Sequence, residues 1–239
     1  MSEYVKITTI NGIGTIEFYH PQSNSLPGNI LAKLATTITE AGNDKNIKVI
    51  ILKSAGERAF CAGASFDELI AIDNPEQGKK FFLGFANVIN AARKCPKFIL
   101  GRVQGKAVGG GVGLASAVDY CFATKHASIK LSELALGIGP FVVGPAVERK
   151  VGLSAMSALA INADKWFDAN WGLQKGLYSE IFQDNESMDK AIYELAFKLS
   201  KSQADFLNSN EVLYSSVLEE KIVVIKEELL NEKEITNKK

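Results

Sequence analysis

The chain has 239 residues, and its 27 basic and 27 acidic side chains give a formal net charge of zero. This balance offers no basic excess for nucleic acid, and the three cysteines form no C-x-x-C pair that would indicate a metal site or a disulfide framework. The N-terminal residues do not resemble a signal peptide, and Gly and Pro interrupt the longest apolar stretch, Leu134 to Val147. We therefore expect a cytoplasmic protein without a membrane span or a bound metal.

The apolar pattern predicts alternating strands and helices. Val5 to Thr9 and Ile16 to Phe18 alternate on either side of Asn11-Gly12, which is typical of a β-hairpin. Residues 27–42 have helical spacing, and residues 49–52 form the continuous apolar run of a strand buried on both faces. The further predicted elements are a short helix from Phe66 opened by a capping box of Ser65 and Glu68, a helix striped by Phe81 to Ala92, strands at 98–103 and 119–123, and helices at 112–118, 140–162, 187–200 and 215–231. This order predicts a layered α/β core followed by helices.

Two glycine-rich segments carry the most information. Residues 58–69 (RAFCAGASFDEL) and 105–115 (GKAVGGGVGLA) each follow a predicted strand and lead into a helical pattern. The first turn of a helix leaves backbone N–H groups without a helical acceptor. Two such turns can direct two N–H donors at one oxygen atom, which makes an oxyanion hole without metal or histidine. Each segment alone is also explained by close helix–strand packing, which requires small residues.

A dinucleotide site is the alternative interpretation of the second segment. Gly111-Val-Gly113-Leu-Ala-Ser116 is a loose G-x-G-x-x-G fingerprint, and Glu133 lies at a suitable distance downstream for a ribose contact. The fingerprint normally opens the first βαβ unit, whereas this segment lies in the middle of the chain. The dinucleotide interpretation also leaves the first glycine segment without a role, so we favour the oxyanion hole.

Glu133 is the candidate acid–base residue. It lies in KLSELALG, among apolar and small residues, where a desolvated carboxylate has a raised pKa and can move a proton. A solvated carboxylate at a strand end is the simpler interpretation. The two histidines, His20 and His126, have no nucleophile motif nearby, so no catalytic triad is predicted. Residues 137–145 are apolar and fit either the approach to a helix or one wall of an acyl pocket.

Together these segments resemble the crotonase superfamily, the enoyl-CoA hydratase/isomerase family, from about Ile13 to about Phe182. The matching stretches are residues 20–26 (HPQSNSL), 58–65, 105–119, 132–137 and 168–177 (DANWGLQKGL). The resemblance implies a crotonase-like spiral of ββα turns in residues 1–182. It also implies a C-terminal helical region in residues 183–239 that mediates a homotrimer or a dimer of trimers.

The resemblance further implies an acyl-CoA thioester as substrate, as in fatty acid metabolism, with no separate cofactor because CoA is part of the substrate. The thioester oxygen would accept hydrogen bonds from the N–H groups of Ala64 and Gly110, and Glu133 would be the catalytic acid–base. The other implied substrate-binding residues are Ser25, Leu26, Ala62, Ser65, Phe66, Asp67 and Phe141.

Departures from the family pattern bear on the reaction. Family hydratases carry two glutamates, and Gly113 stands where the first is expected, while Glu133 matches the second. Ser65 replaces the usual aspartate, and Phe141 stands where the dehalogenase branch has its nucleophilic aspartate. The stretch 136–141 is closer to the isomerase branch, in which one glutamate moves a proton. We therefore predict isomerisation of 3-enoyl-CoA to 2-enoyl-CoA. Hydration of 2-enoyl-CoA by Glu133 alone, or a catalytically silent acyl-CoA-binding or scaffold protein, are the alternatives.

Overall fold

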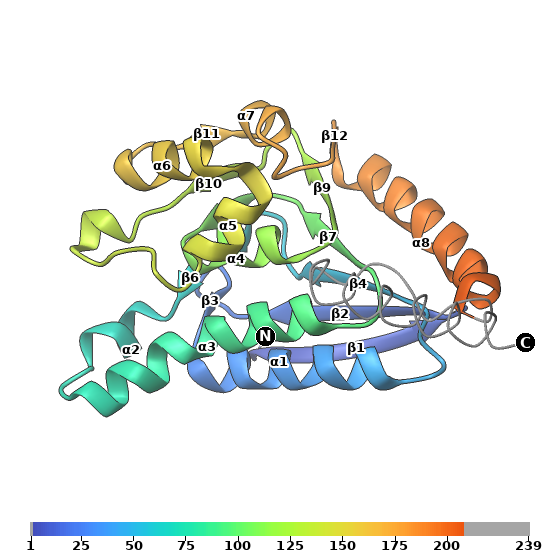
Figure 1. Ribbon diagram of the computed structural model, residues 1–239, viewed down its shortest axis with the longest axis horizontal. Helices are drawn as coiled ribbons and strands as arrows, with labels where there is room; N and C mark the ends of the chain where they lie inside the picture. The colour runs from blue at the N-terminus through green and yellow to red at the C-terminus, as the bar shows by residue number, and fades with distance from the viewer. Residues whose placement is uncertain (1, 208–239) are drawn as a thin grey trace, which may run out of the picture.

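The computed structural model describes residues 2–207 and has an α/β architecture (Figure 1). Its largest sheet has six strands in the order β1-β2-β4-β7-β9-β12. These strands are β1 (Tyr4–Ile10), β2 (Ile13–Tyr19), β4 (Val49–Ser54), β7 (Ile99–Val103), β9 (Tyr120–Thr124) and β12 (Glu180–Phe182). The β1–β2 pair is antiparallel, as predicted from Asn11-Gly12, and the other neighbours are parallel.

Two smaller sheets complete the spiral. The second sheet contains β11 (Phe167–Asp168), β10 (Ser128–Lys130), β8 (Lys106–Val108) and β5 (Ala59–Cys61), and the third pairs β3 (Ser25–Leu26) with β6 (Gly63–Ala64). Strands β4, β7 and β9 of the large sheet are each followed by a short strand of the second sheet and then by a helical segment. This repeat confirms the predicted spiral of ββα turns.

The helices follow the predicted order, but one predicted helix is divided into two, and η1 and α7 are additional. They are α1 (Gly28–Asn43), α2 (Phe66–Ile70), α3 (Pro75–Lys94), α4 (Gly110–Ala117), the 3₁₀ helix η1 (Leu134–Leu136), α5 (Gly144–Val151), α6 (Leu153–Ile161), α7 (Ala169–Gln174) and α8 (Asn185–Leu207). The single helix predicted at 140–162 is wrong, because Gly152, at φ +80°, separates α5 from α6. The helix predicted at 215–231 lies outside the described residues.

The apolar core has two layers on either side of the large sheet. On one face the main cluster includes Leu34 of α1, Val88 of α3 and Leu114 of α4. On the other face Met188 and Ile192 of α8 pack on the sheet. The N-terminal part of the predicted C-terminal region therefore joins the same folded unit as the core. None of the helices described in residues 2–207 has the length and apolarity needed to cross a membrane.

Glycines let the two glycine-rich segments approach each other backbone to backbone. A Cβ atom on Gly105 would lie 2.2 Å from the Arg58 carbonyl oxygen, and one on Gly111 would lie 2.3 Å from the Cys61 carbonyl oxygen. Backbone atoms cannot move aside as a flexible side chain can. These contacts therefore hold the start of α4 directly against β5.

We expect Gly111→Ala to destabilise the protein by about 1–3 kcal/mol or more, because the added methyl overlaps the Cys61 carbonyl. The matched control is Gly78→Ala in α3, where the nearest atom to a new Cβ is an Ile72 methyl at 3.6 Å. That change should stabilise the protein by about 0.4–1 kcal/mol, since alanine restricts the unfolded chain. Urea unfolding of the two variants measures both effects, and equal changes would contradict the packing argument.

Candidate active site

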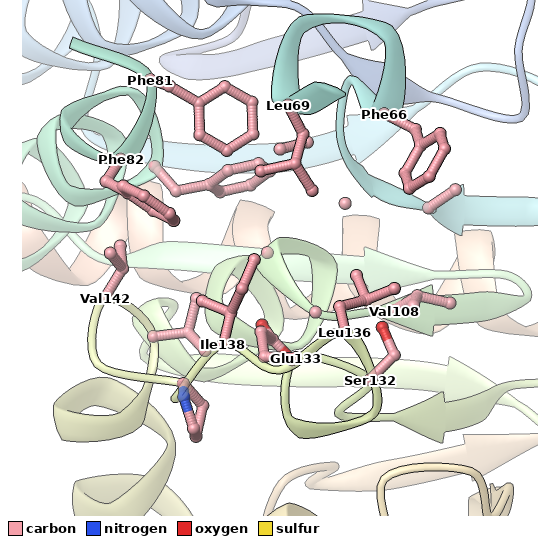
Figure 2. A pocket seen from close by; sticks show the side chains of 18 of the residues that line it. Phe66, Leu69, Phe81, Phe82, Val108, Ser132, Glu133, Leu136, Ile138 and Val142 are labelled. Atoms are coloured by element: carbon pink, nitrogen blue, oxygen red, sulfur yellow. The ribbon is translucent and has the colours of Figure 1, made fainter. Parts of the chain in front are cut away.

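One cavity of about 250 Å³ brings the two glycine segments together with the segment around Glu133 (Figure 2). The side that carries α2 and α3 presents Phe66, Leu69 and Phe81, and the opposite side presents Glu133 and Ile138. The remaining residues of the lining are Ser25, Ala62, Gly63, Ala64, Phe82, Phe85, Val108, Gly109, Gly110, Ser132, Leu136, Gly139, Pro140, Val142 and Val143. The wall is therefore mostly apolar, with backbone from both glycine turns.

The two glycine turns meet at this cavity. Gly63 has φ +95°, and a Cβ on it would lie 3.1 Å from the Val108 carbonyl oxygen and 3.7 Å from the Gly110 nitrogen. Gly110 is the first residue of α4, so its N–H has no acceptor within the helix. The same wall carries the partial positive charge of the helix N-terminus. Ala64 follows Gly63 directly and lines the same cavity.

Asn24, in the β2–β3 connection, and Ser25, in β3, hold the first glycine segment in place. The Asn24 amide nitrogen donates hydrogen bonds to the carbonyl oxygens of Ala55, at 2.9 Å, and Ala59, at 3.0 Å. The Ser25 hydroxyl donates to the Ala64 carbonyl oxygen at 2.9 Å. Residues 20–26, the first stretch of the family resemblance, therefore hold the Ala64 backbone in position.

The Glu133 carboxylate lies against the second glycine turn. Gly109 has φ +51°, which disfavours any residue with a side chain, and a Cβ on it would lie 3.0 Å from Glu133 Oε1. Glu133 Oε2 is buried and has no hydrogen-bond partner among the described residues. Burial raises the pKa of Glu133 above its ordinary value. A carboxyl group with a raised pKa is better suited to accept and return a proton than a solvated one.

Gly113, where the first family glutamate is expected, lies against packed apolar side chains. A Cβ on Gly113 would lie 2.7 Å from Val143 Cγ1 and 3.1 Å from Ile89 Cδ1. A carboxylate at this position would have to displace both side chains. Among the described residues that line the cavity, Glu133 is the one ionisable side chain.

The structure brings together six of the ten predicted site residues. Ser25, Ala62, Ala64, Phe66, Gly110 and Glu133 line the cavity. The other four, Leu26, Ser65, Asp67 and Phe141, are not part of the cavity lining, and their contact with substrate stays a prediction.

Each of the four residues has a different placement. Leu26 is fully buried in the core, because neighbouring residues of β3 point to opposite sides. Ser65 caps α2 by accepting a hydrogen bond from the Glu68 N–H, and Asp67 is exposed in the same helix. Phe141 is 83% exposed. The predicted capping box is only half formed, because the Glu68 carboxylate accepts a hydrogen bond from the Gly28 N–H instead.

The phenylalanines of α3 are not among the predicted site residues. Phe81, Phe82 and Phe85 all line the cavity. Their spacing of three and four residues places them on one helix face, which also fits an ordinary core stripe. The helical spacing of these phenylalanines is visible in the sequence. It does not distinguish a helix face that packs in the core from one that lines a cavity.

Comparison with known proteins agrees with the geometry. The sequence profile described as enoyl-CoA hydratase/isomerase matches residues 8–239. The chain belongs to this family. Crystal structures of enoyl-CoA hydratases show the same fold: one from Mycobacterium smegmatis has a TM-score of 0.78 at 23% identity, covering 93% of this chain and 89% of that one. One from Bacillus anthracis has a TM-score of 0.76 at 24% identity, covering 87% and 84%.

Curated relatives in the family have different named activities. A short-chain-enoyl-CoA hydratase of Clostridium acetobutylicum is 30% identical over 74% of this chain and 67% of its own length. The human mitochondrial methylglutaconyl-CoA hydratase is 31% identical over 74% of this chain and 52% of its own length. The ethylmalonyl-CoA decarboxylase of Xenopus tropicalis is 30% identical over 54% of this chain and 44% of its own length. The chain thus spans about half the length of two of these three relatives.

Proposed function

We propose that this protein isomerises 3-enoyl-CoA to 2-enoyl-CoA thioesters, with Glu133 moving the proton. The observation that carries the proposal is the single carboxylate in the described lining, together with the packing of Val143 and Ile89 at Gly113. Hydration requires a positioned water as well as a proton for the α-carbon, and two carboxylates share that work easily. Double-bond migration requires one group that takes a proton and returns it nearby.

The backbone of the two glycine turns would hold the thioester. Its carbonyl oxygen would accept hydrogen bonds from the N–H groups of Ala64 and Gly110. The N-terminus of α4 would further stabilise negative charge that develops on that oxygen. The close contact of Gly63 with the backbone around Gly110 supports this pairing, because it places the two turns on one wall.

Glu133 would then move one proton along the substrate. Its carboxylate takes the proton from C2, and the electron pair of that bond passes into a dienolate whose charge lies on the thioester oxygen. Protonation at C4 by the Glu133 carboxylic acid moves the double bond from C3–C4 to C2–C3 and restores the thioester carbonyl. The raised pKa of Glu133 suits this role, because the group must gain and lose a proton in one cycle.

Hydration of 2-enoyl-CoA is the second candidate function. The printed names of the Clostridium and human relatives are those of hydratases, which favours this chemistry. Glu133 alone would then have to position the water and supply the proton. A silent acyl-CoA-binding protein is the third candidate. It predicts thioester binding without turnover.

We expect conversion of 3-hexenoyl-CoA to 2-hexenoyl-CoA to be at least about tenfold faster than hydration of 2-hexenoyl-CoA, because the described site offers no second carboxylate for water. The two rates are measured side by side, and Glu133→Gln should lower whichever activity is present by about 10²–10⁴-fold. Efficient hydration with little double-bond migration would reverse the choice of reaction. Binding without either reaction would support the silent alternative.

We also propose a cytoplasmic homotrimer or dimer of trimers, which rests on the family resemblance. Light scattering of the full chain tests the assembly.

A further inference from the structure

We call the part of this cavity that is lined by Phe81, Phe82, Phe85 and Val142 its acyl end. We propose that the acyl end accepts an uncharged, apolar acyl chain and rejects acyl groups that carry a second carboxylate. This inference rests on the proposed function, because it assigns the substrate class of the same site. It concerns binding, so it can be tested without any turnover.

Phe85 shows where the acyl end begins. A Cβ on Gly110 would lie 2.4 Å from the Phe85 ring, so the ring lies directly against the residue proposed to hold the thioester oxygen. Phe81 and Phe82 lie one turn earlier on the same helix, and Val142 lines the cavity with them (Figure 2). A chain that leaves a thioester at Gly110 along α3 therefore passes between aromatic and aliphatic side chains.

Among the described residues, no basic side chain lines this enclosure to pair with a negative charge. Among the described lining residues the two hydroxyls belong to Ser25 and Ser132, and the Ser25 hydroxyl already donates to the Ala64 carbonyl oxygen. The lysines that precede the phenylalanines on α3, Lys79 and Lys80, are exposed and do not belong to the lining. The one ionisable side chain there is Glu133, whose charge has the same sign as that of a second substrate carboxylate.

A second carboxylate on the acyl group would thus lose its hydrating water without gaining a cationic partner. Transfer of an unpaired charge into an apolar site is strongly unfavourable. Its repulsion of Glu133 would add to this penalty and would further disfavour the ionised form of the catalytic group. An apolar chain of the same length has neither penalty, and it gains by leaving water.

The test compares hexanoyl-CoA with adipoyl-CoA, two saturated thioesters of equal chain length that differ in a terminal carboxylate. Isothermal titration calorimetry with the full-length protein should give an adipoyl-CoA Kd at least about 100-fold weaker than that of hexanoyl-CoA. Equal affinities would overturn this inference and leave the proposed isomerisation standing. If neither thioester bound, the proposed function would fail and this inference would fail with it.

Phe82 allows a matched pair of variants. It lines the cavity but is 38% exposed, so a long unbranched side chain can replace it without leaving a void in the core. Phe82→Lys should improve the affinity for adipoyl-CoA relative to hexanoyl-CoA by at least about tenfold, because it supplies the missing cation. Phe82→Met has similar length without charge and should keep the wild-type preference. If the two variants gave the same ratio of affinities, charge would not set the selectivity and the inference would be wrong.

Discussion

The Glu133→Gln variant should lose about 10²–10⁴-fold in turnover of a 3-enoyl-CoA while it still binds hexanoyl-CoA. Glutamine keeps the shape of the side chain but cannot accept a proton at the required stage. Steady-state kinetics on 3-hexenoyl-CoA and calorimetric titration with hexanoyl-CoA separate the two effects. Ser132→Ala is the matched control, because Ser132 lines the same cavity without a role in proton transfer. Near-wild-type rates for Glu133→Gln on every thioester would show that another group is the base.

The same variant has a second, independent signature in its stability. Burial raises the pKa of Glu133 in the folded protein above its ordinary value of 4.5. Between the unfolded and folded pKa values the native state binds more protons than the unfolded state, so this group lowers stability as pH rises. The penalty is absent at lower pH, where the carboxyl is protonated in both states.

Glutamine has no such titration. The difference in Tm between Glu133→Gln and the wild type should therefore shift in favour of the variant as the pH rises above the ordinary pKa of 4.5. Thermal unfolding in parallel buffers measures this shift. A difference that stays constant with pH would mean that the carboxylate is solvated, and the cavity placement of Glu133 would be wrong.

Local chemistry explains which parts of the site could be predicted from the sequence. The turn residues Asn11-Gly12 define the first hairpin, and the glycine segments and Glu133 are chemically distinctive wherever they occur. The strands of the two smaller sheets, such as β3 and β6, are only two or three residues long. So short a segment has no measurable periodicity, and its pairing depends on long-range contacts.

The same limit applies to single residues. Ser25 and Leu26 are neighbours in one matching stretch, yet Ser25 lines the cavity and Leu26 is fully buried in the core. A family motif marks such a stretch as a whole. Which neighbour faces the substrate depends on the pairing of β3 with β6, which places alternate side chains on opposite sides.

Gly113 shows what three-dimensional packing adds to an absence in the sequence. The sequence indicates only that no carboxylate is present there. In the structure the space beside Gly113 is occupied by Val143 and Ile89, so the position is not an empty place for a water. The absence of a carboxylate at position 113 is consistent with the apolar packing beside it. Together they favour a reaction that needs one carboxylate.

Replacement of the peptide bond between Gly109 and Gly110 by an ester should lower turnover by about 10²–10³-fold, which is typical for the loss of one oxyanion-hole donor. The ester removes the Gly110 N–H and leaves the side-chain packing unchanged. Gly110→Pro also removes this donor. However, its ring carbons would overlap Phe85, since a Cβ at this position lies 2.4 Å from the ring. The ester therefore isolates the hydrogen bond, whereas proline would also disturb the acyl end of the cavity.

The matched control is an ester one bond later, between Gly110 and Gly111, which removes a neighbouring N–H from the first turn of α4. Equal losses of turnover from the two esters would indicate damage to the helix. No loss from the Gly109–Gly110 ester would exclude the Gly110 N–H as an oxyanion-hole donor. The enolate oxygen carries more negative charge than the ground-state carbonyl, so the missing donor should reduce kcat far more than it weakens hexanoyl-CoA binding. A loss confined to binding would make Gly110 a substrate-holding group and would leave the stabilisation of the enolate to other donors.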